Sequence, residues 1–160
     1  MPTNEEIYEG DIVVRNLSED QSLHHGHLAN FSLLWPRGIV EYRFYWTFPR
    51  EHRTSVMEAM AYITRKSPCV TFVPALPESE NYVEIGSGGP ICASELGMRG
   101  GKQRIWLNSG CFEEGLTKPV HELMHTLGTE ELQNTSLGPG PWLYLSITLK
   151  AIKLQATQAA

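Results

Sequence analysis

Residues 121–128 read His-Glu-Leu-Met-His-Thr-Leu-Gly, and the rest of the chain is interpreted outward from this stretch. Four residues turn an α-helix through about 400°, so His121 and His125 lie on one helix face, where both rings can bind one zinc ion. Glu122 directly follows the first histidine and is a candidate general base for a zinc-bound water. The pattern H-E-x-x-H is typical of zinc-dependent peptide hydrolysis.

The residues around the motif favour a helix. Thr117 and Pro119 are suited to a helix start, because proline in the first turn loses no helical hydrogen bond. Gly128 can adopt the left-handed conformation that ends a helix. The same letters also arise by chance on a solvated helix face, but an apolar stripe at helical spacing on the other side, made by Val120, Met124 and Leu127, favours the metal site.

A catalytic zinc site usually has three protein ligands, so a third donor is expected. No His, Cys or Asp follows His125 in the sequence, and Glu131 lies three residues after Gly128. In the metzincin pattern a histidine occupies that position. Glu131 is therefore a candidate oxygen ligand, and we expect it to be a poor replacement for the histidine.

Four segments and two cysteines follow one another in a characteristic order that ends with the motif: Trp35 to Tyr42, Met60 to Pro74, Asn81 to Ile85, Cys92, Cys111, and His121 to Gly128. This ordered set resembles the astacin-like zinc metalloendopeptidases, a family of metzincins. The resemblance covers roughly residues 35–128 and is more specific than any single motif.

The resemblance implies an α+β fold, in which a zincin-like N-terminal subdomain has a twisted mixed sheet and two helices. It also implies a zinc-dependent endopeptidase that hydrolyses peptide bonds in proteins, with Zn²⁺ bound by His121 and His125 and with Glu122 as general base. The resemblance stops after Gly128, so we expect the family's C-terminal subdomain to be missing. The alternative is a catalytically inactive, truncated fragment that at most binds zinc or a protein partner.

Three cysteines bear on the compartment. By resemblance, Cys92 and Cys111 form a disulfide, while Cys69 lacks its usual partner in the C-terminal subdomain. The resemblance thus implies a secreted protein, although residues 1–10 are polar and acidic and do not form a signal peptide. Three reduced cysteines in an intracellular protein, such as a metal sensor, remain the alternative.

Tyr8-Glu9-Gly10-Asp11 resembles a family propeptide element in which an aspartate binds the zinc of the zymogen. Asp11 is thus a candidate inhibitory ligand, but Glu-Gly-Asp is equally suited to an ordinary turn, and both interpretations stay open. We therefore expect three regions: a propeptide-like segment at 1–32, an astacin-like catalytic N-terminal subdomain at 33–128, and a divergent tail at 129–160.

The composition limits the partners. The chain has 160 residues, a net charge of −5 and no basic cluster with interleaved aromatics, so nucleic acid is not an expected partner. The apolar segment 142–154 is too short to span a bilayer of about 30 Å. The expected partner is a protein or peptide substrate.

Periodicity predicts strands at 38–46, 70–73, 82–85 and 103–108. It also predicts one helix from about Pro49 to Lys66, with Thr47 as a possible cap, and a second helix at the motif.

Overall fold

The computed structural model describes residues 5–8, 11–15 and 34–129, with backbone alone for residues 5–8, 14 and 15. In chain order its helices and strands are β1 (Glu5–Tyr8), β2 (Ile12–Arg15), β3 (Ile39–Phe44), α1 (Arg50–Lys66), β4 (Thr71–Pro74), β5 (Tyr82–Gly86), β6 (Ala93–Glu95), β7 (Lys102–Trp106) and α2 (Thr117–Thr126). Short 3₁₀ turns, η2 (Pro36–Gly38) and η3 (Ser109–Phe112), precede β3 and α2.

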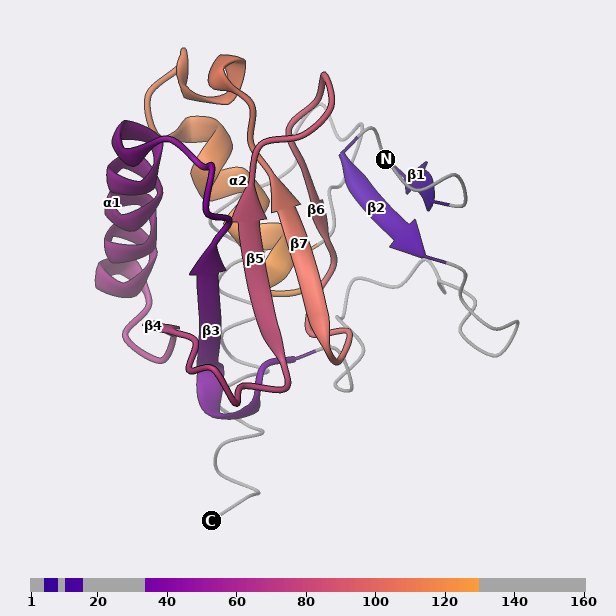
Figure 1. Cartoon of the computed structure of the whole chain (residues 1–160). Helices are drawn as coiled ribbons and strands as arrows, with labels where there is room; N and C mark the ends of the chain where they lie inside the picture. Colours follow the sequence, from indigo (N-terminus) through magenta and orange to yellow (C-terminus); the bar gives the residue numbers. More distant parts are fainter. Residues whose placement is uncertain (1–4, 9–10, 16–33, 130–160) are drawn as a thin grey trace, which may run out of the picture.

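The described strands form one mixed sheet in the order β1-β2-β6-β7-β5-β3-β4 (Figure 1). Strands β4, β3, β5 and β7 run parallel to one another, whereas β6 runs antiparallel to β7. The N-terminal hairpin of β1 and β2 extends this sheet, because β2 pairs in parallel with β6. The fold therefore places a segment from before residue 16 at the edge of the domain's own sheet.

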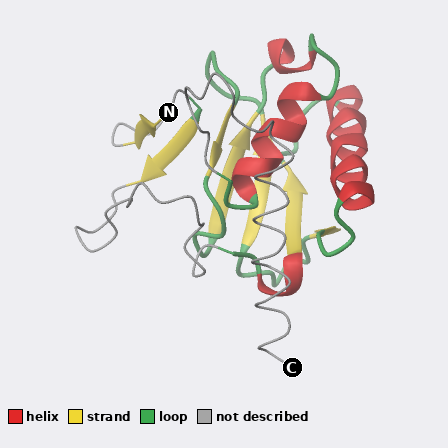
Figure 2. Ribbon diagram, turned by 180° about the vertical axis from the view of Figure 1, so that it is seen from behind, coloured by secondary structure: helices red, strands yellow, loops and turns green. Residues whose placement is uncertain are grey.

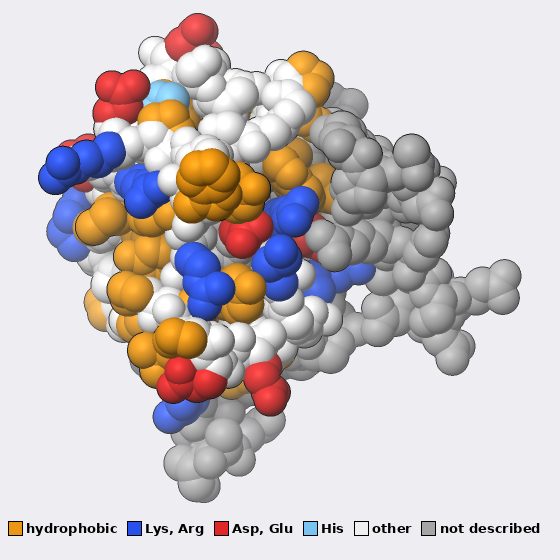
Figure 3. All heavy atoms as spheres, viewed as in Figure 1, with side chains coloured by type: hydrophobic (Ala, Val, Ile, Leu, Met, Phe, Trp, Pro, Cys, Tyr) orange, Lys and Arg blue, Asp and Glu red, His pale blue; other side chains and the backbone are white. Residues whose placement is uncertain are grey.

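Both helices lie on the same face of the sheet, as the view from behind shows (Figure 2). On the opposite face, charged side chains lie between apolar ones (Figure 3). There, Glu84 on β5 lies between Lys102 and Arg104 of β7, with nitrogen–oxygen distances of 3.7 Å to each. Such partly exposed ion pairs contribute little to stability, and they are typical of a solvated sheet face.

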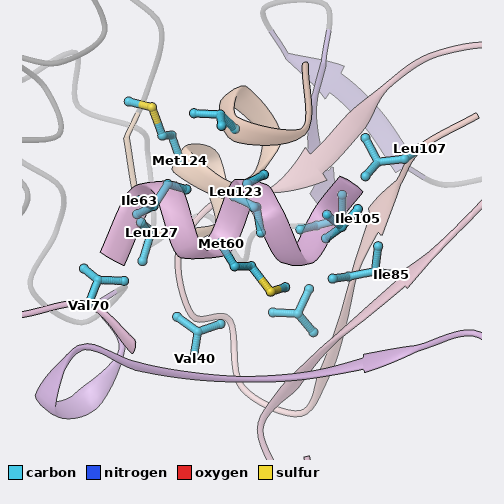
Figure 4. Packing of buried hydrophobic residues seen from close by; sticks show 14 of the residues in the cluster. Val40, Met60, Ile63, Val70, Ile85, Ile105, Leu107, Leu123, Met124 and Leu127 are labelled. Atoms are coloured by element: carbon cyan, nitrogen blue, oxygen red, sulfur yellow. The ribbon is translucent and has the colours of Figure 1, made fainter. Parts of the chain in front are cut away.

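The main core lies between the helices and the sheet. The inner face of α1 contributes Val56, Ala59, Met60 and Ile63, all buried. They belong to one core cluster with Leu123 and Met124 of α2, with Leu127 just after that helix, and with inward-facing residues of the central strands. Figure 4 shows Met60 and Ile63 packed among these residues. Burial of this apolar surface fixes the motif helix against the sheet. No helix within the described ranges is both long enough and apolar enough to cross a membrane.

The expected α+β architecture, a mixed sheet with two helices, is confirmed. The predicted cap of α1 is wrong: Pro49 occupies that position, and no side chain caps the helix. Instead, the Arg53 guanidinium donates hydrogen bonds to the carbonyls of Phe48, Tyr45 and Trp46, so the loop before the helix is fixed from inside it. The expected helix start is confirmed, because α2 begins at Thr117 and has Pro119 in its first turn.

The disulfide between Cys92 and Cys111 is present, as predicted, and it closes a loop with a sequence separation of 19. Replacing both cysteines by serine is expected to lower the free energy of unfolding by roughly 3 kcal/mol, because the open loop gains entropy in the unfolded chain. Urea denaturation of the oxidised parent and of the double variant measures this difference. Replacing Cys69, which is not in a disulfide, by serine is the matched control, and an equal loss there would contradict the assignment.

Candidate metal centre

Helix α2 brings the two motif histidines together, as their spacing predicts. The rings of His121 and His125 are 4.5 Å apart at their centroids and nearly perpendicular, and the Nε2 atoms are separated by 2.9 Å. His125 is buried, with 2% of its surface exposed, whereas His121 is half-buried. Two imidazole nitrogens therefore face a common point at the edge of the domain.

A third donor comes from the N-terminal segment. Asp11 Oδ2 lies 2.7 Å from His121 Nε2, and Asp11 Oδ1 lies 3.3 Å from His125 Nε2. The pairing of β2 with β6 places Asp11, because the Ser94 amide donates a hydrogen bond to the Asp11 carbonyl at 2.9 Å. Asp11 lies in the turn between β1 and β2 and also contacts both histidines. The turn and the contact, which the sequence offered as alternatives, are therefore both present.

The backbone after α2 fixes the orientation of His125. Its Nδ1 atom lies 2.7 Å from the carbonyl oxygen of Thr129, which can only accept a hydrogen bond. The Nδ1 atom therefore carries the proton, and in the neutral ring Nε2 keeps its lone pair for a metal. Gly128 has φ of 96°, a left-handed conformation that turns the chain back so that the Thr129 carbonyl reaches the ring.

The three donors suit zinc. Asp11, His121 and His125 each offer one atom, and these atoms lie within 4.8 Å of one another. Tetrahedral zinc with its usual bond lengths places neighbouring ligand atoms about 3.3 Å apart. Here the two Nε2 atoms are 2.9 Å apart, and the Asp11 carboxylate approaches His121 through Oδ2 at 2.7 Å and His125 through Oδ1 at 3.3 Å. Two imidazoles and one carboxylate are ordinary zinc ligands, so the site fits Zn²⁺ after small adjustments.

Glu122 lies next to His121 on the helix and is buried, with 1% of its surface exposed. Its charge acts on the ring of His125: burial lowers the pKa of that histidine, but hydrogen bonds to Asp11 and Thr129 and the charges of Glu122 and Asp11 raise it above its ordinary value. Glu122 is thus a buried carboxylate whose charge reaches one of the metal donors.

Three hydrogen bonds attach the C-terminal end of α2 to the sheet and its flanking loops. The Trp35 indole donates to the Thr126 carbonyl at 2.9 Å, and the Thr126 and Ser94 hydroxyls are 2.9 Å apart. The Gly97 amide donates to the His125 carbonyl, also at 2.9 Å. These contacts join the motif helix to β6 and to the segment before β3, so the histidines are held by a rigid frame.

This fold and this donor set have counterparts among known proteins. The family model Astacin, which describes a family of peptidases, matches residues 28–135. The chain belongs to the astacin family.

Several curated relatives of this astacin-family chain are nematode proteins. It is 36% identical to zinc metalloproteinase nas-17 of Caenorhabditis elegans over 59% of the chain and 21% of that protein. It is 31% identical to zinc metalloproteinase nas-15 of the same species, over 76% of the chain and 23% of that protein. The chain thus matches less than a quarter of the length of either relative.

A solved structure supports the fold. High choriolytic enzyme 1, a hatching enzyme zinc-protease from the medaka fish Oryzias latipes, aligns with a TM-score of 0.55 and 26% identity. The alignment covers 62% of this chain and 50% of the fish enzyme. The mixed sheet with two helices is therefore an astacin-type arrangement.

The predicted site residues divide into two groups in this astacin-family structure. His121, His125, Glu122 and Asp11 lie together, whereas Glu131 lies outside the described residues. Sequence reasoning missed the Thr129 carbonyl and the Trp35 indole. A backbone carbonyl carries no residue signature, and the sequence marks Trp35 only as part of the first strand segment.

The contact between Asp11 and the histidines has a consequence for pH in the metal-free protein. Burial raises the pKa of Asp11, but hydrogen bonds from His121 and His125 outweigh this and hold the pKa well below its ordinary value. The folded pKa of Asp11 is depressed, so its stabilisation is present above about pH 4 and is lost at lower pH. The folded pKa of His125 is raised, so its stabilisation is complete below about pH 6.5 and is lost as pH rises through the folded pKa.

We therefore expect the stabilisation from this contact in the chelated protein to be greatest between about pH 4 and 6.5. Thermal unfolding across pH, in the presence of a chelator, measures it for the parent chain and for Asp11→Asn. The difference in midpoint between the two proteins should be largest in that window. A difference that stays constant across roughly pH 3 to 9 would contradict the pairing.

Proposed function

We propose that this chain carries the zinc-binding subdomain of an endopeptidase, with its inhibitory N-terminal segment in the site. In this proposal residues 1–32 are propeptide-like, residues 33–128 form the catalytic subdomain, and residues 129–160 are a divergent tail. The observation that carries the proposal is the convergence of Asp11, His121 and His125 within 4.8 Å, beside a buried Glu122.

Each residue has a chemical task in this proposal. When bound, Zn²⁺ lowers the pKa of a coordinated water and polarises the substrate carbonyl. His121 and His125 hold the metal through Nε2, and Thr129 fixes the His125 ring through Nδ1. Glu122 accepts the proton of the attacking water and delivers it to the departing amine. Asp11 lies among the donors, so it would hold the metal in place of the water, and the chain in this form would be inhibited.

The direction of β2 supports an inhibitory segment rather than a substrate. By family resemblance, a substrate is expected to pair antiparallel with an edge strand near the site. Strand β2 occupies the open edge of β6 but runs parallel to it, with Ile12 opposite Ser94 and Val13 opposite Glu95. The N-terminal segment therefore presents its peptide bonds in reverse to the site, and we propose that it blocks the cleft without being cut there.

The disulfide and the family are the basis for proposing an exported protein that acts on protein or peptide substrates. Disulfides persist in oxidising compartments, where the bond between Cys92 and Cys111 would be maintained.

A second candidate is a catalytically inactive protein that binds zinc without turnover. One observation favours it: within the described ranges, the third donor near the histidines is Asp11, and its departure leaves two imidazoles. Affinity for zinc falls steeply when a ligand is lost, since even changes outside the coordinating residues cost roughly 10- to 100-fold.

Zinc content and turnover separate the two candidates. The oxidised full chain is incubated with excess zinc, dialysed, and assayed for bound metal and for cleavage of an unfolded protein substrate. We expect one zinc per chain, and hydrolysis in the Asp11→Ala variant that a chelator abolishes and added zinc restores. Bound zinc with no hydrolysis by any variant would leave the inactive candidate, and metal-free protein would refute both.

A further inference from the structure

A second, smaller apolar cluster lies apart from the main core, at the junction of β2, β6 and β7. It consists of Val13, Ala93 and Trp106, all buried, with the half-buried Ile91 packed against them. We call these four residues the Val13 cluster. Val13 belongs to the N-terminal segment, whereas the other three belong to the domain that the segment covers.

The domain's part of this cluster is held in place independently of Val13. Ala93 at the start of β6 is directly opposite Trp106 at the end of β7. The loop after β5 supports the indole, because a Cβ added to Gly88 would lie 3.0 Å from Trp106 Cδ1. Cys92, next to Ala93, is fixed by its disulfide to Cys111. Departure of the N-terminal segment would therefore expose an apolar surface that is already formed.

The surface lies close to the metal donors along the same strand edge. Asp11 is opposite the start of β6, through the hydrogen bond to Ser94, and Val13 is two residues further along β2. Successive residues of a strand point to opposite faces, so Ile12 lies on the face of Ser94 and α2, and Val13 lies on the other face with Ala93 and Trp106. Val13 therefore marks where the side chain of a bound peptide would lie two residues from the metal. A substrate that runs in the opposite direction to β2 would place at this surface a residue that precedes its scissile bond.

We infer that Ile91, Ala93 and Trp106 form an apolar subsite for a substrate side chain, and that Val13 occupies it while the N-terminal segment is bound. The inference rests on the proposed function and names a specificity of the same site. The small Ala93 side chain leaves room above the indole for a branched aliphatic group such as that of Val13. The subsite thus favours valine, isoleucine or leucine about two residues before the cleaved bond.

A peptide series tests the preference. The zinc-loaded full chain carrying Asp11→Ala is given peptides that differ only at the second residue before the cleaved bond, with valine, leucine, alanine or aspartate there. Pockets that read one aliphatic group discriminate by roughly 10- to 200-fold, and we expect kcat/KM for valine or leucine to exceed that for alanine or aspartate by at least about 10-fold.

Two variants in the same background test the assignment to these residues. Ala93→Leu places extra bulk where Val13 lies and should remove the preference for leucine, and Ala93→Val is the milder version should the first not fold. Leu76→Ala is the matched control, because Leu76 is an exposed apolar residue in the loop after β4, and it should keep the full preference. Selectivity that is unchanged in both Ala93 variants would overturn the inference.

Binding distinguishes failure of the subsite from failure of the proposed function. Trp106 is a direct reporter. Its fluorescence is isolated by measuring the Asp11→Ala chain and subtracting the signal of the same chain that also carries Trp106→Phe. If no peptide is cleaved but valine and leucine peptides change the Trp106 signal at concentrations at least about 10-fold lower than the others, the subsite stands and the peptidase proposal fails. Cleavage without preference at this position, or no response of Trp106 to any peptide, overturns the subsite.

Discussion

Replacing Glu122 by glutamine is expected to lower kcat for peptide hydrolysis by roughly 10²- to 10⁴-fold while bound zinc stays at one per chain. Glutamine has nearly the same shape as glutamate and cannot accept the proton of the attacking water. Glu122 is buried on α2 beside His121 and lies outside the three-residue donor set, so the metal should remain bound.

The measurement compares kcat and zinc content in the Asp11→Ala background, where the proposed inhibitory ligand is absent. Glu114→Gln is the matched control, because Glu114 is exposed just before α2 and should leave both quantities unchanged. Hydrolysis at the parental rate in Glu122→Gln would remove the general base from the mechanism. Loss of zinc would instead make Glu122 part of the metal site.

Replacing Asp11 by alanine is expected to raise hydrolysis by roughly 10- to 100-fold, the population change that corresponds to one charged hydrogen-bonding contact. In the parent chain the Asp11 carboxylate lies 2.7 Å from His121 and 3.3 Å from His125. Without it, the described part of the N-terminal segment keeps its strand pairing and the burial of Ile12 and Val13, and the metal site opens to water. The same variant should bind zinc more weakly, because one of the three donors is lost.

The Asp11→Ala change is thus expected to raise the rate of hydrolysis and to lower the affinity for zinc, and the two quantities can be measured separately. Initial rates at saturating zinc measure the gain, and competition with a zinc-binding dye measures the loss of affinity. Glu51→Ala is the matched control, because the Glu51 side chain is largely exposed on α1, and it should change neither quantity. Equal rates in Asp11→Ala and the parent chain would show that the segment does not inhibit.

The motif helix could be predicted closely from the sequence, because several local signals agree there. The spacing of the histidines, the apolar stripe that includes Met124 and Leu127, and the glycine stop at Gly128 all apply to the same dozen residues. The pairing of Cys92 with Cys111 was also predicted, but only through the family resemblance.

Strand β6 could not be predicted, and the reason is physical. It has three residues, Ala93 to Glu95, and all three are buried, so no alternation marks it. The sheet contacts of β2 could not be predicted either, because a parallel partner distant in the chain leaves no local signal. The contact of Asp11 with the histidines depends on both strands, so the sequence offered the residue as a candidate but not the geometry.

The hydrogen bond from the Trp35 indole to the Thr126 carbonyl joins residues 91 positions apart. Trp35 leaves the ribosome early in synthesis, whereas the end of the motif helix follows after every described strand. The histidine pair therefore cannot acquire its anchored position until this late segment docks onto a much earlier one. A nascent chain that ends before Thr126 therefore lacks this anchor, and the histidine pair is fixed only after every described strand has been synthesised.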